Sequence, residues 1–184
     1  MIEVMVALGL ITVLMASLGT YFVSSVKVSR YQAQIQAAVR LAQAGMETAR
    51  GYGGPTLLVG RSQCTSATCT NVSGYDTFGY LSNMVRWDGG VSGVTPAVPR
   101  PDAMPVAELQ IPINGVTYSR YHFVGKCWQA ATGGPCGTNS ALPVAMVRLV
   151  VGVTWSEANC RYTMCIRAAT ALFSLDPTDP VFQP

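Results

Sequence analysis

The sequence predicts an α+β protein: one long N-terminal α-helix packed on an antiparallel four-stranded β-sheet, with disulfide-stapled loops. Three observations predict this class. Residues 1–50 contain no proline and read as one continuous helix. From residue 106 onward, short apolar runs are separated by turn-forming residues, which is typical of strands joined in hairpins. The six cysteines all follow the apolar N-terminal segment, which favours a head stabilised by disulfides.

The predicted helix changes character along its length. Residues 1–26 hold one charged side chain, Glu3, in an otherwise apolar segment that is long enough to cross a bilayer. Residues 27–50 form an amphipathic half, which we expect to pack on the head. Its apolar stripe recurs at three- and four-residue spacing and consists of Val28, Tyr31, Ile35, Ala38, Ala42, Met46 and Ala49. We therefore expect a membrane or filament-core half followed by a packing half.

Residues 51–184 are predicted to form the globular head. Glycines and a proline end the helix at residues 51–55, and residues 55–104 read as loop-rich. Two pairs of strands follow, the first around Asn114-Gly115, which is the strongest short hairpin signal. The expected strands cover residues 106–113, 116–128, 144–155 and 162–175. Pro112 is expected to limit the first of them to an edge or a bulge.

The cysteines indicate structural disulfides, because none lies in a C-x-x-C pair of the kind that binds zinc. Disulfides persist outside the reducing cytosol, so we expect the head to face an oxidising compartment. Short spacing favours three local bridges, although the sequence leaves crossed pairings open. The favoured bridges are Cys64–Cys69, Cys127–Cys136 and Cys160–Cys165.

No residue pattern predicts catalysis. His122 is the one histidine, lies within a predicted strand, and has no nucleophile motif with which to form a catalytic triad. Trp87, Trp128 and Trp155 are expected to pack in the core or on the sheet. We therefore expect no enzyme activity, no cofactor and no metal site. The chain also has no basic run, so nucleic acid is not indicated as a partner, although a modest DNA affinity stays open.

Residues Ile2-Glu3-Val4-Met5-Val6-Ala7-Leu8 resemble the start of the type IV pilin superfamily. Mature chains of that family begin Phe/Met-Thr-Leu-Ile-Glu and continue as an apolar run. The long amphipathic helix, the antiparallel sheet and the Val-x-Trp at Val153–Trp155 are similar as well. The Glu-Val-Met-Val-Ala form is similar to the minor pilins and minor pseudopilins. The specific part of the resemblance covers the N-terminal segment, and the rest is similar in architecture.

The sequence departs from the family pattern at one point. The family's acidic residue is the fifth of the mature chain, whereas Glu3 is the third residue here. We expect that a leader and the first two mature residues are missing from this sequence. The resemblance implies that Glu3 pairs with the N-terminal amine of a neighbouring subunit. The alternative is that Glu3 is a hydrated residue at the membrane surface, since helix N-termini tolerate acids.

The resemblance implies a structural subunit of a type IV pilus or similar filament. The subunit would wait in the inner membrane and then enter a cell-surface or periplasm-spanning filament. Its partners would be other pilin subunits, the inner membrane and the pilus assembly machinery. Three alternatives remain: a minor pseudopilin of a type II secretion system, a single-span anchored extracytoplasmic binding protein, and an anchored enzyme. A cleaved secretory signal fits poorly, because the apolar run has no basic residues before it and no A-x-A-like site after it.

Overall fold

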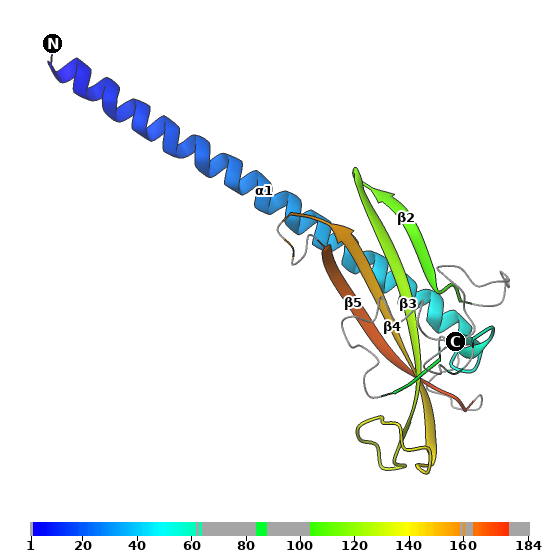
Figure 1. Cartoon of the computed structure of the whole chain (residues 1–184). Coiled ribbons are helices and arrows are strands. Elements are labelled where there is room, and N and C mark those ends of the chain that lie inside the picture. The colour runs from blue at the N-terminus through cyan, green and yellow to red at the C-terminus, as the bar shows by residue number, and fades with distance from the viewer. Residues whose placement is uncertain are drawn as a thin grey trace. The chain divides into compact units, whose positions relative to one another are not determined.

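The computed structural model describes residues 2–61, 63, 84–87, 104–158, 160 and 164–176. Within these residues the chain forms one long helix, a short 3-10 helix and an antiparallel sheet (Figure 1). The helices are α1 (Ile2–Tyr52) and η1 (Thr56–Leu58). The strands are β1 (Val85–Arg86), β2 (Ala107–Ile113), β3 (Val116–Gln129), β4 (Val144–Ser156) and β5 (Met164–Ser174). The predicted α+β class is confirmed.

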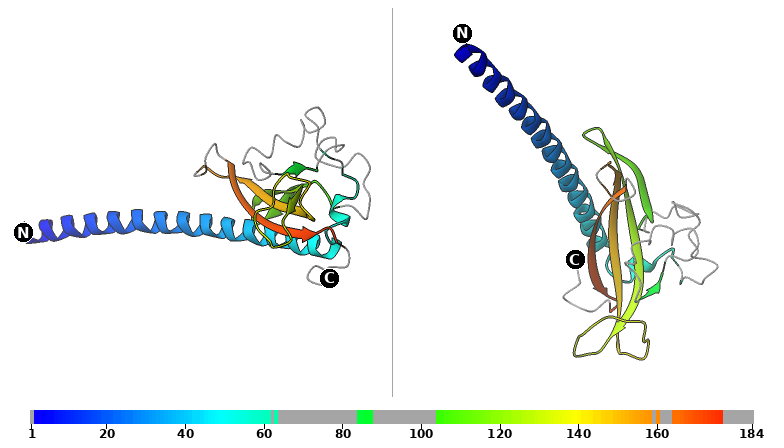
Figure 2. Two further views of the ribbon diagram at one scale, coloured as in Figure 1. Left: turned by 90° about the horizontal axis from the view of Figure 1, so that it is seen from below. Right: turned by 60° about the vertical axis from the view of Figure 1, so that its left-hand side comes forward.

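The sheet has five strands among the described residues, so the predicted number of four is wrong. The strand order is β1-β3-β4-β5, and β2 pairs with the same side of β3 as β1 does. Figure 2 shows β3, β4 and β5 side by side in one twisted layer. The four predicted strands are present within two residues of their expected ends. The missed strand, β1, has two residues, which is too short for an alternating pattern to appear in the sequence.

The first hairpin turns where the sequence predicts it. Asn114 has a φ of 49° and Gly115 a φ of 78°, the left-handed backbone that asparagine and glycine adopt most readily. The pairing of β2 with β3 shifts register between Glu108 and Ile111, and Gln110 also has a positive φ of 59°. This irregularity lies next to Pro112, and β2 pairs with β3 alone among the described strands. The expected edge position and bulge are therefore both present.

Contacts divide the chain into two units, Met1–Ala37 and Ala38–Pro184. The described residues of the first unit are one uninterrupted stretch of α1. The second unit holds the C-terminal part of α1, which crosses one face of the sheet behind β3 and β4 in Figure 1. The predicted apolar stripe is fully buried only from Ala38 onward, whereas its first residue, Val28, is 55% exposed. The buried helix residues are Ala38, Ala42, Gly45, Met46 and Ala49.

Both faces of the central strands are buried. On the face that meets α1, the buried side chains are Tyr118, His122, Val124, Val147, Leu149, Val151, Val153 and Trp155. On the opposite face a second cluster contains Met84, Ala107, Tyr121, Phe123, Cys127, Met146 and Val150. Successive residues of a strand point to opposite faces, and the middle of each strand is buried at consecutive positions, at residues 121–125 of β3 and 149–153 of β4. The sheet is therefore the middle layer of the head, with apolar packing on both sides.

The helix ends in a tight connection to the sheet. Gly53 has a φ of 71°, and its N–H donates to the Ala49 carbonyl over 3.2 Å, a common helix terminator. Gly54 is buried next to the last residue of β5. A Cβ built on Gly54 would lie 1.9 Å from the Ser174 carbonyl oxygen, so no side chain fits there. The glycines that the sequence marks as helix-ending therefore also allow this close backbone contact.

Candidate functional site

The N-terminal part of α1 is the strongest functional feature of the described residues. The helix contains a stretch that is long and apolar enough to cross a membrane, and none of that stretch is buried. Membrane anchors and N-terminal signal sequences both contain such a stretch. The exposed side chains include Val4, Leu8, Ile11, Leu14 and Phe22. Such a surface is unfavourable in water and therefore calls for lipid or protein around it.

Three hydroxyl groups in this segment donate hydrogen bonds within the helix. Thr12 donates to the Gly9 carbonyl, Ser17 to the Leu14 carbonyl, and Thr20 to the Ser17 carbonyl, each over 2.8 Å. A polar group without a partner costs several kcal/mol in hydrocarbon, so these bonds make the segment compatible with a lipid environment. Glu3 lies in the first turn and is the one charged side chain of the first 26 residues. It is thus the residue of this segment that most needs an external partner.

The second part of the candidate site is the contact of α1 with the sheet around Gly45, Arg120 and His122, which we call the helix seat. A Cβ built on Gly45 would lie 2.9 Å from Val151 Cγ1, 3.1 Å from His122 Nε2 and 3.2 Å from Arg120 Cδ. Gly45 therefore lets one helix turn approach the strands more closely than any other residue would. Glycine within a helix costs up to ~1 kcal/mol relative to alanine. The structure shows the compensating contact.

Arg120 fixes the same helix turn through hydrogen bonds. Its Nη1 donates to the Leu41 carbonyl over 3.2 Å, and its Nη2 forms an ion pair with Glu108 on β2. The Arg120 side chain is only 13% exposed, which is unusual for a charged residue. Sequence reasoning missed this residue. The available signal was an arginine that alternates with Tyr118, His122 and Val124 on one face of a predicted strand.

His122 lies beside Arg120 on the same face of β3, with 1% of its surface exposed. Neither ring nitrogen has a well-aligned hydrogen-bond partner. Burial, and to a smaller extent the charges of Arg120 and Arg61, together lower the pKa of His122 from its ordinary 6.5 to about 3. The Pro105 carbonyl has the opposite effect and raises the pKa of His122. The imidazole is therefore neutral at pH 7, as expected for a histidine with a packing role.

Arg61 holds the segment before β2 against β3. Its guanidinium donates to the His122 carbonyl over 3.3 Å and to the carbonyls of Met104 and Pro105 over 3.4 Å each. The Arg61 side chain thus connects two segments that are far from it in the sequence, residues 104–105 and His122 on β3. Like Arg120, Arg61 is a positioning residue that the sequence analysis did not identify.

The tryptophans occupy two kinds of position. Trp155 is buried, and its ring centroid lies 5.8 Å from that of Tyr118 on the helix-facing side. Trp87 and Trp128 lie on either side of Lys126, whose Nζ is 5.4 Å and 5.3 Å from their ring centroids. Such cation–π contacts stabilise by about 0.5–1 kcal/mol where water still reaches them. All three tryptophans therefore stabilise the sheet, as expected.

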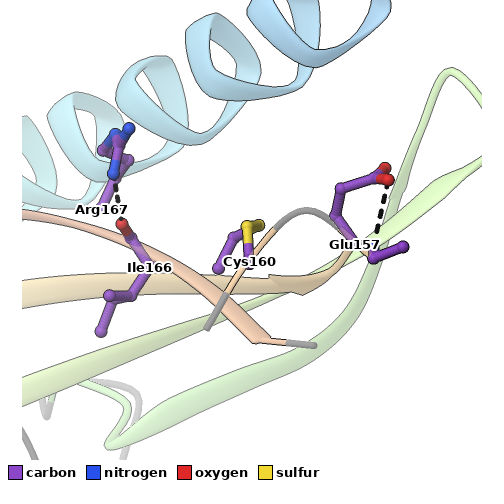
Figure 3. Close-up of a disulfide and its surroundings, with 6 residues drawn as sticks. Glu157, Cys160, Ile166 and Arg167 are labelled. Atoms are coloured by element: carbon purple, nitrogen blue, oxygen red, sulfur yellow. Dashed lines mark hydrogen bonds between the residues drawn. A yellow bond between two sulfur atoms is a disulfide. The ribbon is translucent and has the colours of Figure 1, made fainter. Parts of the chain in front are cut away.

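Two of the three favoured disulfides are present. Cys127 and Cys136 join the end of β3 to the following loop, and Cys160 and Cys165 close the connection between β4 and β5 (Figure 3). Figure 3 also shows Arg167 donating to the Ile166 carbonyl and the Glu157 carboxylate accepting from the Ala158 N–H. The remaining pair, Cys64–Cys69, lies outside the described residues.

Non-reducing peptide mapping of the purified protein is expected to recover the peptides joined by Cys127–Cys136 and by Cys160–Cys165. The same experiment tests the predicted Cys64–Cys69 bridge. Alkylation without reduction provides the control, because a bridged cysteine does not react. Modification of all six cysteines would contradict both the bridges and the oxidising compartment inferred from them.

Among the described residues, no group of three or more histidine, cysteine, aspartate or glutamate side chains is placed to hold a metal ion. The structure thus brings together Gly45, Arg120 and His122 at the helix seat, while Glu3 lies in the other unit. No protein-family model, no curated protein and no solved structure matches the chain.

Proposed function

We propose that the protein is a structural subunit of a type IV pilus or pilus-like filament, held in the inner membrane before assembly. The observation that carries this proposal is α1 itself. One unbroken helix begins as an exposed apolar segment with an acid in its first turn and ends packed on a disulfide-bonded head. The N-terminal resemblance to the type IV pilin superfamily supports the same reading.

Assembly exchanges one apolar environment for another. In the membrane, the side chains of residues 4–26 contact lipid, and in a filament they would contact the same segment of neighbouring subunits. Lipid tails are about as apolar as leucine, so this exchange contributes little hydrophobic free energy. Packing and the few polar groups then determine how the subunits align. Glu3 is the polar group best suited to this, through a charge pair with a neighbouring N-terminal amine.

A minor pseudopilin of a type II secretion system is the closest alternative, because its subunits would have the same helix and head. Electron microscopy of sheared cell-surface material, with mass spectrometry of the subunits, distinguishes the two. Recovery of the chain in surface filaments supports a pilus subunit. An anchored binding protein from a different class would stay in the membrane and stay monomeric in detergent.

Glu3→Leu is expected to leave membrane insertion intact and to lower incorporation into filaments at least tenfold. The reason is that removing one member of a buried ion pair strands the other charge, at roughly 3–5 kcal/mol, whereas about 1.4 kcal/mol already changes an association constant tenfold. The measurement is the ratio of variant to wild-type subunit in sheared filaments, at equal membrane levels.

Two further variants serve as controls. Glu3→Asp keeps the charge and is expected to retain most of the incorporation. Glu47→Leu removes an exposed carboxylate from the same helix within the head and is expected to assemble normally. An incorporation ratio near one for Glu3→Leu would contradict the charge pair and leave helix packing as the sole determinant of alignment.

A further inference from the structure

The contact between α1 and the sheet contains a buried group that can acquire a proton. His122 lies on the helix-facing side of β3, beneath the helix turn that runs from Leu41 to Gly45. Gly45 has no side chain to separate the helix backbone from the ring. A proton on the imidazole would therefore be placed directly at the seat of the helix, where water does not reach it.

Two guanidinium groups act on this ring. Arg120 on β3 and Arg61 after η1 both act on His122, and Glu108 on β2 already pairs with Arg120. The buried face of α1 offers no charge, since its residues there are alanine, glycine and methionine. β4 presents Val151. Among the described residues, the Pro105 carbonyl is the one group that favours a proton on the ring. A proton on His122 would thus place a positive charge next to two guanidinium groups, at a position that water does not reach.

We infer that His122 makes the docking of α1 on the sheet sensitive to acid, so that protonation loosens residues 38–49 from the head while the sheet persists. The inference is independent of the proposed function. The sheet can persist because it has other supports. The cluster on its opposite face does not involve α1, and each of the two described disulfides joins residues of the head outside α1.

The direction of the effect follows from linkage. In the docked state the imidazole stays neutral down to a pKa of about 3, whereas in the loosened state it regains an ordinary pKa near 6.5. The loosened state binds the extra proton, so docking is at full strength above pH 6.5. Docking weakens as the pH falls toward 3 and then levels off. Between pH 7 and pH 5 the equilibrium constant for loosening is expected to rise about twenty-five-fold.

The experiment follows the ring and the helix together, in the full chain in detergent micelles. His122 is the one histidine of the chain, so histidine-selective NMR reports its protonation without assignment of other residues. Amide hydrogen exchange, corrected for the intrinsic effect of pH, reports the opening of α1. We expect the ring to remain neutral at pH 5 in the docked state. Exchange protection of residues 42–49 is expected to fall about twenty-five-fold from pH 7 to pH 5, with residues 147–153 of β4 unchanged.

Other outcomes would overturn the inference. If the ring titrates near pH 6.5 while the helix stays protected, protonation does not act on docking. If β4 loses protection together with the helix, the acid effect is general unfolding. If the helix protection does not change with pH, the ring has no influence on docking.

The variant His122→Leu is expected to keep the same helix protection at pH 7 and pH 5, because it cannot be protonated. Glu47→Gln, on the exposed side of the same helix, is the control for a change of charge away from the seat. It is expected to show the wild-type pH dependence. If His122→Leu does not fold, the comparison of helix and β4 in the wild-type chain still decides the question.

Discussion

Gly54→Ala is expected to destabilise the head by at least ~3 kcal/mol, a large share of the ~5–15 kcal/mol that holds a typical domain together. The added methyl group would lie 1.9 Å from the Ser174 carbonyl oxygen and 3.3 Å from Phe173 Cβ. The first of these atoms belongs to the backbone at the end of β5, which cannot rotate away. Either the helix end or the strand end must move.

Thermal unfolding followed by circular dichroism measures the effect, with an expected fall in Tm of about 6–12 °C. Gly51→Ala is the matched control. Gly51 lies in the last turn of the same helix, and a Cβ there meets nothing within 4 Å. Because alanine favours the helix, this control is expected to be stabilising by up to ~1 kcal/mol. Equal melting temperatures for the two variants would mean that Gly54 does not contact β5 as described.

Ala49→Asp is the second change with a large expected effect. Ala49 is 0% exposed on the buried side of α1, so an aspartate there would bury a carboxylate with no cation provided for it. Such a substitution costs several kcal/mol. The unfavourable position of an acid near a helix C-terminus adds less than ~1 kcal/mol. We expect residues 38–49 to lose their protection from amide hydrogen exchange, and the free energy of unfolding of the head to fall by several kcal/mol.

Ala44→Asp tests whether burial is the cause. Ala44 lies on the exposed side of the same helix, five positions earlier, and the same substitution there places the carboxylate in water. We expect a change in the free energy of unfolding within about 0.5 kcal/mol. If both variants unfold alike, the helix does not pack on the sheet through the face that contains Ala49.

The sequence was sufficient for the helix and the four longer strands because each has a strong local signal. The helix has a long run without proline and a glycine-rich end, and the first hairpin has Asn114-Gly115 at its turn. The two described disulfides could be chosen because their cysteines are close in the chain. In each case, the signal lies within a few neighbouring residues.

The features that the sequence did not reveal depend on contacts between distant residues. Arg120 reads as an ordinary polar residue until β3 is placed beneath α1, where the Leu41 carbonyl accepts its hydrogen bond. Gly45 likewise looks like a helix weakness until Val151 and His122 are placed against it. The stripe of α1 was predicted to pack from residue 27, but periodicity cannot tell where the opposing surface begins. Glu3 could be identified from the sequence as a charge in an apolar run, and its role stays a prediction.

The burial of β3 and β4 on both faces has a consequence for how the chain finds its alignment. In a sheet with one wet face, a slip of one residue turns apolar side chains toward water and is strongly opposed. In the middle of these strands, at residues 121–125 and 149–153, a slip would exchange one buried face for another, so hydrophobicity there discriminates poorly between neighbouring alignments. The native strand alignment must therefore be determined by features that do not repeat along the strand. One is Gly152, where a Cβ would lie 3.2 Å from the Phe123 ring, so that a slipped strand would bring a valine beneath that ring. A chain that closes its turns and bridges before it collapses would reach the native alignment directly, whereas early collapse would leave near-equivalent alignments to search.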